Sequence, residues 1–188
     1  MAYTKRSAPR DHLLATASRL FYIDGINGVG VDRILQEAEV TRATLYRHFA
    51  GKEALVVAYL EREDQMIRAL WNEGLGHAVS PGHALEMAIE GIADDAYRHH
   101  TLGCPFIKAA SEFPDPKSPV RQAINKHRAW FHAELRRLLV EAGRDDVDAK
   151  AETLAMLRDA LMVGCFLDDP DVTRRTFVRN ARWVADLR

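Results

Sequence analysis

The 188-residue sequence has few cysteines and no long apolar run. Its two cysteines, Cys104 and Cys165, show no metal-ligand or redox spacing, so the sequence predicts neither a disulfide framework nor a zinc site. No apolar stretch approaches the roughly 20 residues that a membrane-spanning helix requires. Residues 1–10 are polar and basic, unlike a signal peptide. We therefore expect a cytoplasmic protein with reduced thiols, no cofactor, no metal and no membrane contact.

The chain also lacks a large excess of charge of either sign. Its net charge is -1, and 47% of its residues are hydrophobic and 28% charged, which is typical of a folded globular protein. Residues 1–53 nevertheless contain eight Lys and Arg residues against six Asp and Glu residues. This small positive excess lies in the same segment as the motif described below, as a phosphate-binding surface requires.

Alternating runs of β-branched residues bounded by turns are absent too, so we predict no strand. Apolar residues instead recur with the period of a helix, and glycine or proline interrupts the pattern at intervals. The length allows a small head joined to a larger body. The sequence thus predicts an all-α protein of about nine helices, at residues 9–23, 31–38, 42–49, 52–72, 81–100, 105–112, 118–142, 148–167 and 171–187.

Residues 31–49 have the anatomy of a helix-turn-helix, in which two short helices pack through small and apolar side chains. Thr41 is suited to cap the second helix, because its hydroxyl can accept an amide hydrogen of the first turn. The exposed face of that helix then offers cations and hydroxyl groups to a DNA major groove, while flanking side chains can hold phosphates. The predicted DNA-binding residues are Arg42, Ala43, Thr44, Tyr46, Arg47, His48 and Lys52.

The same segment resembles the tetracycline-repressor (TetR) family of transcriptional regulators. The resemblance is carried by Leu20-Phe21, Gly25, Val31-x-x-Ile34, Ala38-x-Val40-Thr41, and above all by the run from Thr44 to Phe49 with Gly51-Lys52-Glu53-Ala54-Leu55 after it. It covers roughly residues 8–60. The resemblance implies an N-terminal three-helix DNA-binding domain, placed here at residues 1–51, and a helical ligand-binding and dimerisation domain at residues 52–188.

Two positions depart from the pattern of that family. Glu39 occupies the turn between the two short helices, where the family usually has glycine, so we expect a positive backbone angle there and an anion close to DNA. Gly30 stands where the family often has Ser or Thr, so the helix that begins at Val31 lacks a side-chain cap. Neither departure alters the predicted recognition helix.

The resemblance also implies a repressor that a small-molecule effector releases from a palindromic double-stranded DNA operator. Because the body is rich in Met and aromatic residues with few polar groups, we expect the effector to be largely apolar. The predicted cavity residues are Met66, Trp71, Met87, Tyr97, Phe106, Phe113, His127, Trp130, Phe131, Asp159 and Met162, with Glu112 as a further polar candidate. For any one aromatic or Met residue taken alone, the sequence favours ordinary core packing over a place in the cavity wall.

By the same resemblance, the last two helices should pair with those of a second chain in a homodimer. These helices carry more apolar surface than two closing helices of a monomer need. Dimerisation would place two recognition helices about 34 Å apart, one turn of DNA. The predicted interface residues are Leu154, Leu157, Leu161, Phe166, Phe177, Trp183 and Val184.

Two other functional classes stay open at this point. An enzyme in the helical body needs convergent titratable groups, and His99, His100 and Cys104 lack a third, orienting group for nucleophilic catalysis. A dimeric interaction protein that does not bind DNA leaves the recognition segment unexplained. We therefore predict a regulator without enzymatic activity. The sequence leaves open its effector, its operator, and the choice between repression and activation.

Overall fold

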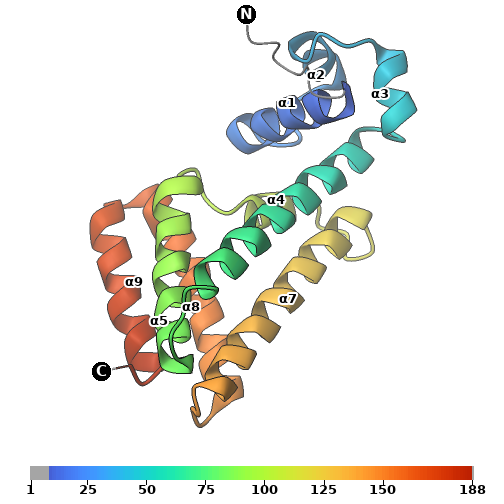
Figure 1. Ribbon diagram of the computed structural model, residues 1–188. Helices are drawn as coiled ribbons and strands as arrows, with labels where there is room; N and C mark the ends of the chain where they lie inside the picture. The colour runs from blue at the N-terminus through green and yellow to red at the C-terminus, as the bar shows by residue number, and fades with distance from the viewer. Residues whose placement is uncertain (1–8, 188) are drawn as a thin grey trace, which may run out of the picture. The chain divides into compact units, whose positions relative to one another are not determined.

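The computed structural model describes residues 9–187 and contains, within that range, nine α-helices, one π-helical turn and no strand (Figure 1). The elements are α1 (Pro9–Asp24), α2 (Val31–Glu37), α3 (Arg42–His48), α4 (Lys52–Leu75), α5 (Pro81–Asp94), the π-helical turn η1 (Asp95–His99), α6 (Pro105–Glu112), α7 (Pro119–Glu141), α8 (Val147–Leu167) and α9 (Pro170–Val184). The predicted all-α fold is confirmed, and each predicted helix begins within one residue of an observed one. None of these helices is long and apolar enough to span a membrane.

The chain divides into two compact units. The first contains residues 9–63 together with Lys108–Ile124, and the second contains Asp64–Ile107 together with residues 125–187. Helices α4, α6 and α7 therefore contribute residues to both units. This division differs from the predicted boundary after residue 51, because the first half of α4 packs with the N-terminal helices: the ring centroids of Phe21 and Tyr59 lie 5.9 Å apart.

In the first unit, α1, α2 and α3 enclose a small apolar core. Leu13 and Leu20 of α1, Ile34 of α2 and Leu45 of α3 are completely buried. Burial of each such side chain contributes about 1.5–3 kcal/mol relative to exposure. Helices α2 and α3 have only seven residues each, too few to be stable alone, so this shared core is what holds α3 in place.

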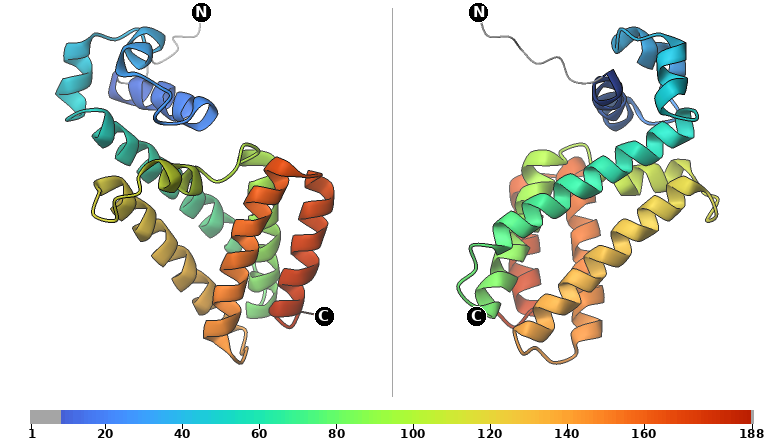
Figure 2. Two further views of the ribbon diagram at one scale, coloured as in Figure 1. Left: turned by 180° about the vertical axis from the view of Figure 1, so that it is seen from behind. Right: turned by 45° about the vertical axis from the view of Figure 1, so that its right-hand side comes forward.

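In the second unit, α5, α8 and α9 pack side by side, as both views of Figure 2 show. Leu85 and Ile89 of α5, Leu161 of α8 and Phe177 of α9 are buried. At Gly164 of α8, a Cβ atom would lie 2.7 Å from the Thr173 Cγ2 atom of α9, which is closer than real Cβ contacts allow. Glycine at this position therefore permits the close approach of the two helices.

The helix predicted at residues 81–100 is not a single α-helix. Ser80 caps its start, with its Oγ accepting the His83 amide hydrogen at 3.1 Å, but the α-helical part ends at Asp94. The chain continues through the π-helical turn η1. Because a π-turn is wider than an α-turn, it shifts the side chains that follow around the helix axis, and such turns are frequent at functional sites. Asp95 and His99 of this turn line the cavity described below.

Candidate DNA-binding surface and apolar cavity

The turn between α2 and α3 has the two features expected from the sequence. Glu39 has a backbone φ of 51°, the left-handed conformation that the family pattern usually gives to glycine, at a cost of about 1–2 kcal/mol. Gly30 stands at the start of α2 without a side-chain cap. Thr41 does cap α3, since its Oγ1 accepts the Thr44 amide hydrogen at 3.2 Å. The backbone of the recognition helix therefore begins at a defined position.

The exposed face of α3 carries most of the predicted DNA-binding side chains. Arg42, Ala43 and Arg47 are exposed, Tyr46 is 54% exposed, and Thr44 is half-buried with its hydroxyl 3.0 Å from that of Thr41. The Arg42 guanidinium donates a hydrogen bond to the Asp32 carboxylate. Arg47 has no ion pair or hydrogen bond with another residue of the described range, so its guanidinium is available for DNA.

The two flanking residues of this surface lie less open to solvent. His48 is half-buried, and its Nε2 atom is enclosed without a hydrogen-bond partner among residues 9–187. A contact from His48 to a phosphate therefore has to come from Nδ1 or follow a rotation of the ring. Lys52 begins α4 and is half-buried as well, and this burial lowers the pKa of its ammonium, while the charge of Glu112 acts in the opposite direction.

The C-terminal part of α6 is tied to the loop that follows α1, and both lie in the first unit. The carboxylate of Glu112 accepts the amide hydrogen of Ile26 at 2.9 Å and also that of Asn27. Lys108 donates from Nζ to the Tyr22 carbonyl oxygen at 2.5 Å and lies 5.0 Å from the centre of the Tyr22 ring. Glu112, expected from the sequence as a polar group of the cavity, instead holds the backbone that leads into α2.

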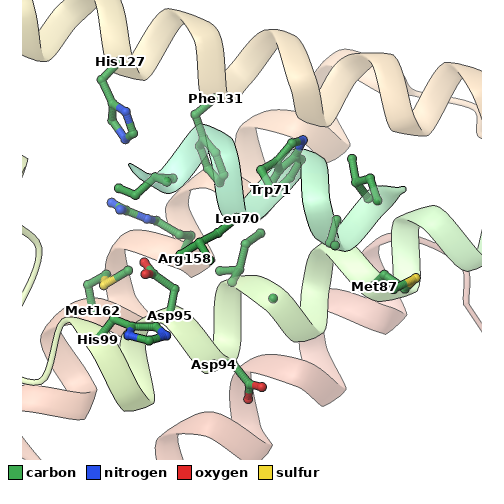
Figure 3. Close-up of a pocket in the computed structure, with 16 residues that line it drawn as sticks. Leu70, Trp71, Met87, Asp94, Asp95, His99, His127, Phe131, Arg158 and Met162 are labelled. Carbon is green, nitrogen blue, oxygen red and sulfur yellow. The ribbon is translucent and has the colours of Figure 1, made fainter. Parts of the chain in front are cut away.

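The second unit contains a cavity of about 220 Å³ between α4, α5, η1, α7 and α8 (Figure 3). Five of the predicted cavity residues line it: Trp71, Met87, His127, Phe131 and Met162. The other lining residues are Ile67, Leu70, Gly74, Leu75, Ala88, Gly91, Ile92, Asp94, Asp95, His99 and Arg158. The cavity is somewhat smaller than the roughly 300–1,000 Å³ of drug-sized ligand pockets, which suits a small effector.

The remaining predicted cavity residues lie elsewhere. Phe106 and Trp130 contact His127 but do not line the cavity, and Phe106 stacks on the imidazole at 3.8 Å between ring centroids. Met66 is 42% exposed, and Phe113 belongs to the first unit. The half-buried Tyr97 forms a hydrogen bond with Asp171, which raises the pKa of its phenol. Asp159 forms ion pairs with Arg128 and Arg158.

His127 is a buried polar group of the cavity wall. Its Nδ1 lies 2.8 Å from the Asp64 Oδ1 atom, and 4% of the residue is exposed. Burial lowers the pKa of His127 to about 4, and the hydrogen bond to Asp64 opposes that effect only in part. The imidazole is therefore neutral near pH 7 and presents no cation to the cavity.

Arg158 is a charged side chain of the cavity lining that the sequence did not predict. It lies on α8, only 7% exposed, and donates from Nη1 to the Cys104 Sγ atom at 3.3 Å and to the Asp159 Oδ1 atom at 3.2 Å. The other carboxylate oxygen of Asp159 accepts a hydrogen bond from Arg128 at 2.9 Å. Arginine is rarely buried, so a sequence pattern assigns it to the surface by default.

Two carboxylates of the lining already have basic partners. Both oxygens of Asp95 lie within 3.0 Å of the His100 Nδ1 atom. Asp94 accepts hydrogen bonds from Arg174, the shorter at 2.7 Å. Among residues 9–187 no three His, Cys, Asp or Glu side chains gather as a metal site requires. His99, His100 and Cys104 do not form a nucleophile cluster in the described structure, since His100 pairs with Asp95 and Cys104 accepts a hydrogen bond from Arg158.

The predicted dimer residues separate into two groups. Leu154, Leu161 and Phe177 are buried within the protomer, and Leu157 and Val184 are half-buried. Phe166 and Trp183 are 54% and 79% exposed. Further exposed apolar residues lie on the same two helices: Met156, Val163 and Leu167 on α8, and Val172 on α9. An apolar stripe of this length on neighbouring helices is typical of a protein interface.

Comparisons with known proteins cover both parts of the chain. A model of the tetR family of bacterial regulatory proteins matches residues 13–59. A model of the tetracyclin repressor-like C-terminal domain matches residues 83–176. The curated relatives include the HTH-type transcriptional repressor NemR of Escherichia coli, which is 30% identical over 143 residues, or 73% of this chain and 69% of NemR.

Solved structures agree with these matches. The TetR-family transcriptional regulator SCO4454 from Streptomyces coelicolor is 40% identical, with a TM-score of 0.90 over 95% of this chain and 94% of that one. A putative TetR-type regulator from Streptomyces avermitilis, sav143, is 23% identical with a TM-score of 0.82 over 97% and 100% of the two chains. The second likeness shows the fold alone.

Proposed function

The chain belongs to the tetR family of bacterial regulatory proteins and is a DNA-binding transcriptional regulator, and we propose that it is a repressor released from a palindromic operator by a small molecule. The main structural support for DNA binding is the geometry of α3. This helix is capped by Thr41 and held by the core through Leu45. It presents on its exposed face Arg47, which has no partner among residues 9–187. A guanidinium in that position suits bidentate contact with a guanine.

The proposed active form is a homodimer that pairs α8 and α9 of two chains. The apolar stripe of Met156, Val163, Leu167, Val172 and Trp183 on these helices supports this assembly. A two-fold axis between the chains would present two copies of α3 to two half-sites, which is why we propose a palindromic operator. The place of action would be the cytoplasm, where bacterial DNA lies.

The proposed effector site is the cavity of the second unit. Its walls are largely apolar, as the expected class of effector requires. Helix α4 contributes its first half to the unit that contains α3 and its second half to the unit that contains the cavity. We propose that ligand binding favours a conformation in which α4 shifts and the DNA affinity falls. Only a difference in ligand affinity between the two conformations can drive such a change.

The experiment that tests this function is DNA binding by fluorescence anisotropy. The duplex is the intergenic DNA beside the protein's own gene, measured at two salt concentrations with nonspecific competitor DNA. We expect tight, competitor-resistant binding that maps to a short palindrome. Binding that competitor DNA abolishes would contradict a specific operator in that region.

Two variants separate base contacts from phosphate contacts in the same assay. Arg47→Ala should lose discrimination between the operator and a scrambled site, because it removes a base contact. Lys52→Ala should weaken binding to all sites alike and reduce the salt slope by about one unit, since it removes one phosphate contact. Arg62→Ala, at an exposed arginine of α4, is the matched control and should bind like the unmodified protein. Unchanged binding in both test variants would contradict the proposed surface.

We assign no reaction to the chain. Its relatives carry the names of transcriptional regulators, and its buried His100 and Cys104 are engaged in separate contacts with Asp95 and Arg158. The regulator function accounts for both the recognition helix and the cavity without a catalytic step.

A further inference from the structure

We propose that the effector is an amphipathic organic anion, whose apolar body fills the cavity and whose acidic group binds Arg158. This inference rests on the proposed ligand-binding function and specifies the chemical class of the ligand. It depends on the state of one buried guanidinium and on the charges around it.

The walls of the cavity favour an apolar ligand body. Trp71 and Phe131 approach edge to face with ring centroids 6.0 Å apart, and Leu70, Met87 and Ile92 complete much of the apolar lining. Gly91 of α5 adds open space, because a Cβ atom at this position would have no neighbour within 4 Å. A bicyclic aromatic ring or a short alkyl chain suits this volume.

Arg158 supplies unsatisfied donors at one end of this apolar space. Figure 3 shows its side chain between His127 and Asp95, at the end opposite Met87. Both of its hydrogen bonds, to Cys104 and Asp159, come from Nη1. Nε and Nη2 have no acceptor among the residues that the structure describes, although Arg158 is 7% exposed. Neither nitrogen is among the enclosed side-chain atoms that lack a partner, so both are open to an acceptor on a ligand. A guanidinium keeps these donors, because it does not lose its proton.

Among the described residues, the guanidinium of Arg158 forms an ion pair with a single carboxylate. Its one carboxylate partner, Asp159, also pairs with Arg128, so two cations share a single anion. Asp95 is held by His100, and Asp94 is held by Arg174. An acidic group on the ligand would complete the pairing of Arg158, and a carboxylate matches the two free donors of a guanidinium in a bidentate arrangement.

The test uses three competitors with one naphthalene body and different heads. The neutral dye N-phenyl-1-naphthylamine reports cavity binding by its fluorescence, and 2-naphthoate, 2-naphthamide and 2-naphthylmethylammonium are titrated to displace it from the full-length protein. We expect 2-naphthoate to displace the dye at a concentration roughly 10- to 100-fold lower than the amide, since a hydrogen bond to a charged group contributes that much. The ammonium compound should be the weakest.

Arg158→Gln should reduce the preference for 2-naphthoate over 2-naphthamide to near unity, and Arg158→Lys should retain part of it. The preference is a ratio within each variant, so a loss of overall stability does not change it. Preference for the amide or the ammonium compound in the unmodified protein would overturn the inference. An unchanged preference in Arg158→Gln would overturn it as well.

A second pair of variants separates failure of this inference from failure of the effector site. Gly91→Trp fills the cavity and should abolish dye binding, whereas Gly82→Trp, on the same helix but outside the cavity lining, should not. If Gly91→Trp binds the dye like the unmodified protein, the cavity is not the effector site and both proposals fail. If Gly91→Trp loses dye binding and all three competitors displace the dye equally from the unmodified protein, the anion inference alone is overturned.

Discussion

Burial decides the protonation state of His127 in the cavity wall. An isolated histidine has a pKa near 6.5, but His127 lies among Phe106, Trp130 and the polar groups of Asp64, Arg68 and Arg158. Burial, the largest influence, and the neighbouring cations lower its pKa to about 4. The sequence placed His127 in the cavity wall, but only the packed structure shows that it is neutral there.

This lowered pKa predicts a loss of stability in acid. Between about pH 6.5 and pH 4 the unfolded chain takes up a proton at His127 while the folded chain does not, so the free energy of unfolding falls as the pH falls. The loss attributable to His127 is of the order of 3 kcal/mol. Urea unfolding from pH 7 to pH 4.5 measures it, with His127→Phe as the non-titrating comparison. Equal pH slopes in the two proteins would contradict the assignment.

For single residues, the sequence predicts a role correctly when that role depends on residues nearby in the sequence. The cap at Thr41 and the positive φ at Glu39 follow from positions within a short motif, and the structure has both. Arg158 and Glu112 could not be placed in the same way. Their partners, Cys104 and Ile26, lie 54 and 86 residues away in the sequence. No local pattern records contacts of that separation.

Among the elements, α6 has an unexpected structural role. The sequence predicts α6 as a short helix between two proline- or glycine-rich breaks and gives it no partner. In the structure its last turn ends at Glu112, whose carboxylate accepts two amide hydrogens of the loop that precedes α2. Hydrogen bonds to a charged acceptor contribute more than neutral ones, so this contact orders the entry to the helix-turn-helix.

We therefore expect Glu112→Ala to destabilise the first unit and weaken operator binding. Loss of both bonds should lower the free energy of unfolding by about 1–3 kcal/mol, because two amide groups lose their acceptor. Glu112→Gln keeps one carbonyl acceptor and should show a smaller effect. Glu141→Ala removes an exposed carboxylate paired with Arg137 and serves as the control with little expected change. Urea unfolding and DNA anisotropy, measured on all three variants, would disprove this role if Glu112→Ala matched Glu141→Ala.

The starts of helices were easier to predict than their internal geometry. Prolines in the first turn and caps such as Ser80 have local causes, and these starts were placed correctly. The π-helical turn at Asp95–His99 has no such signal, since its residues also suit an α-helix. Its position depends on packing against α8 and α9, which the sequence does not reveal. The carboxylate of Asp95 and the imidazole of His99, which this turn brings to the cavity, were therefore missed.

At the scale of the whole molecule, the solvent exposure of the apolar residues on α8 and α9 separates those that fill the core from those that a second chain could cover. The sequence alone does not separate the two groups. Leu154, Leu161 and Phe177 fill the core of the protomer, whereas Phe166 and Trp183 leave most of their surface in solvent. The resemblance to the TetR family, together with the apolar surface of these two helices, predicted all five as interface candidates. A helix buried on two faces is apolar on both, so the sequence does not separate the two groups. The exposed members are the ones that a second chain would cover.

Trp183→Asp is accordingly expected to convert the proposed dimer into a folded monomer. Since Trp183 is 79% exposed in the protomer, its replacement should leave the helical content and the cavity intact, while a charge in an apolar interface opposes association. Sedimentation velocity measures the change in mass, and Val79→Asp, at an 88% exposed loop residue, controls for added charge. The monomer should also lose most of its affinity for a palindrome, because two half-sites no longer bind as a unit. An intact dimer in Trp183→Asp would exclude this residue from the interface, and a monomer with full operator affinity would exclude the two-fold mode of DNA binding.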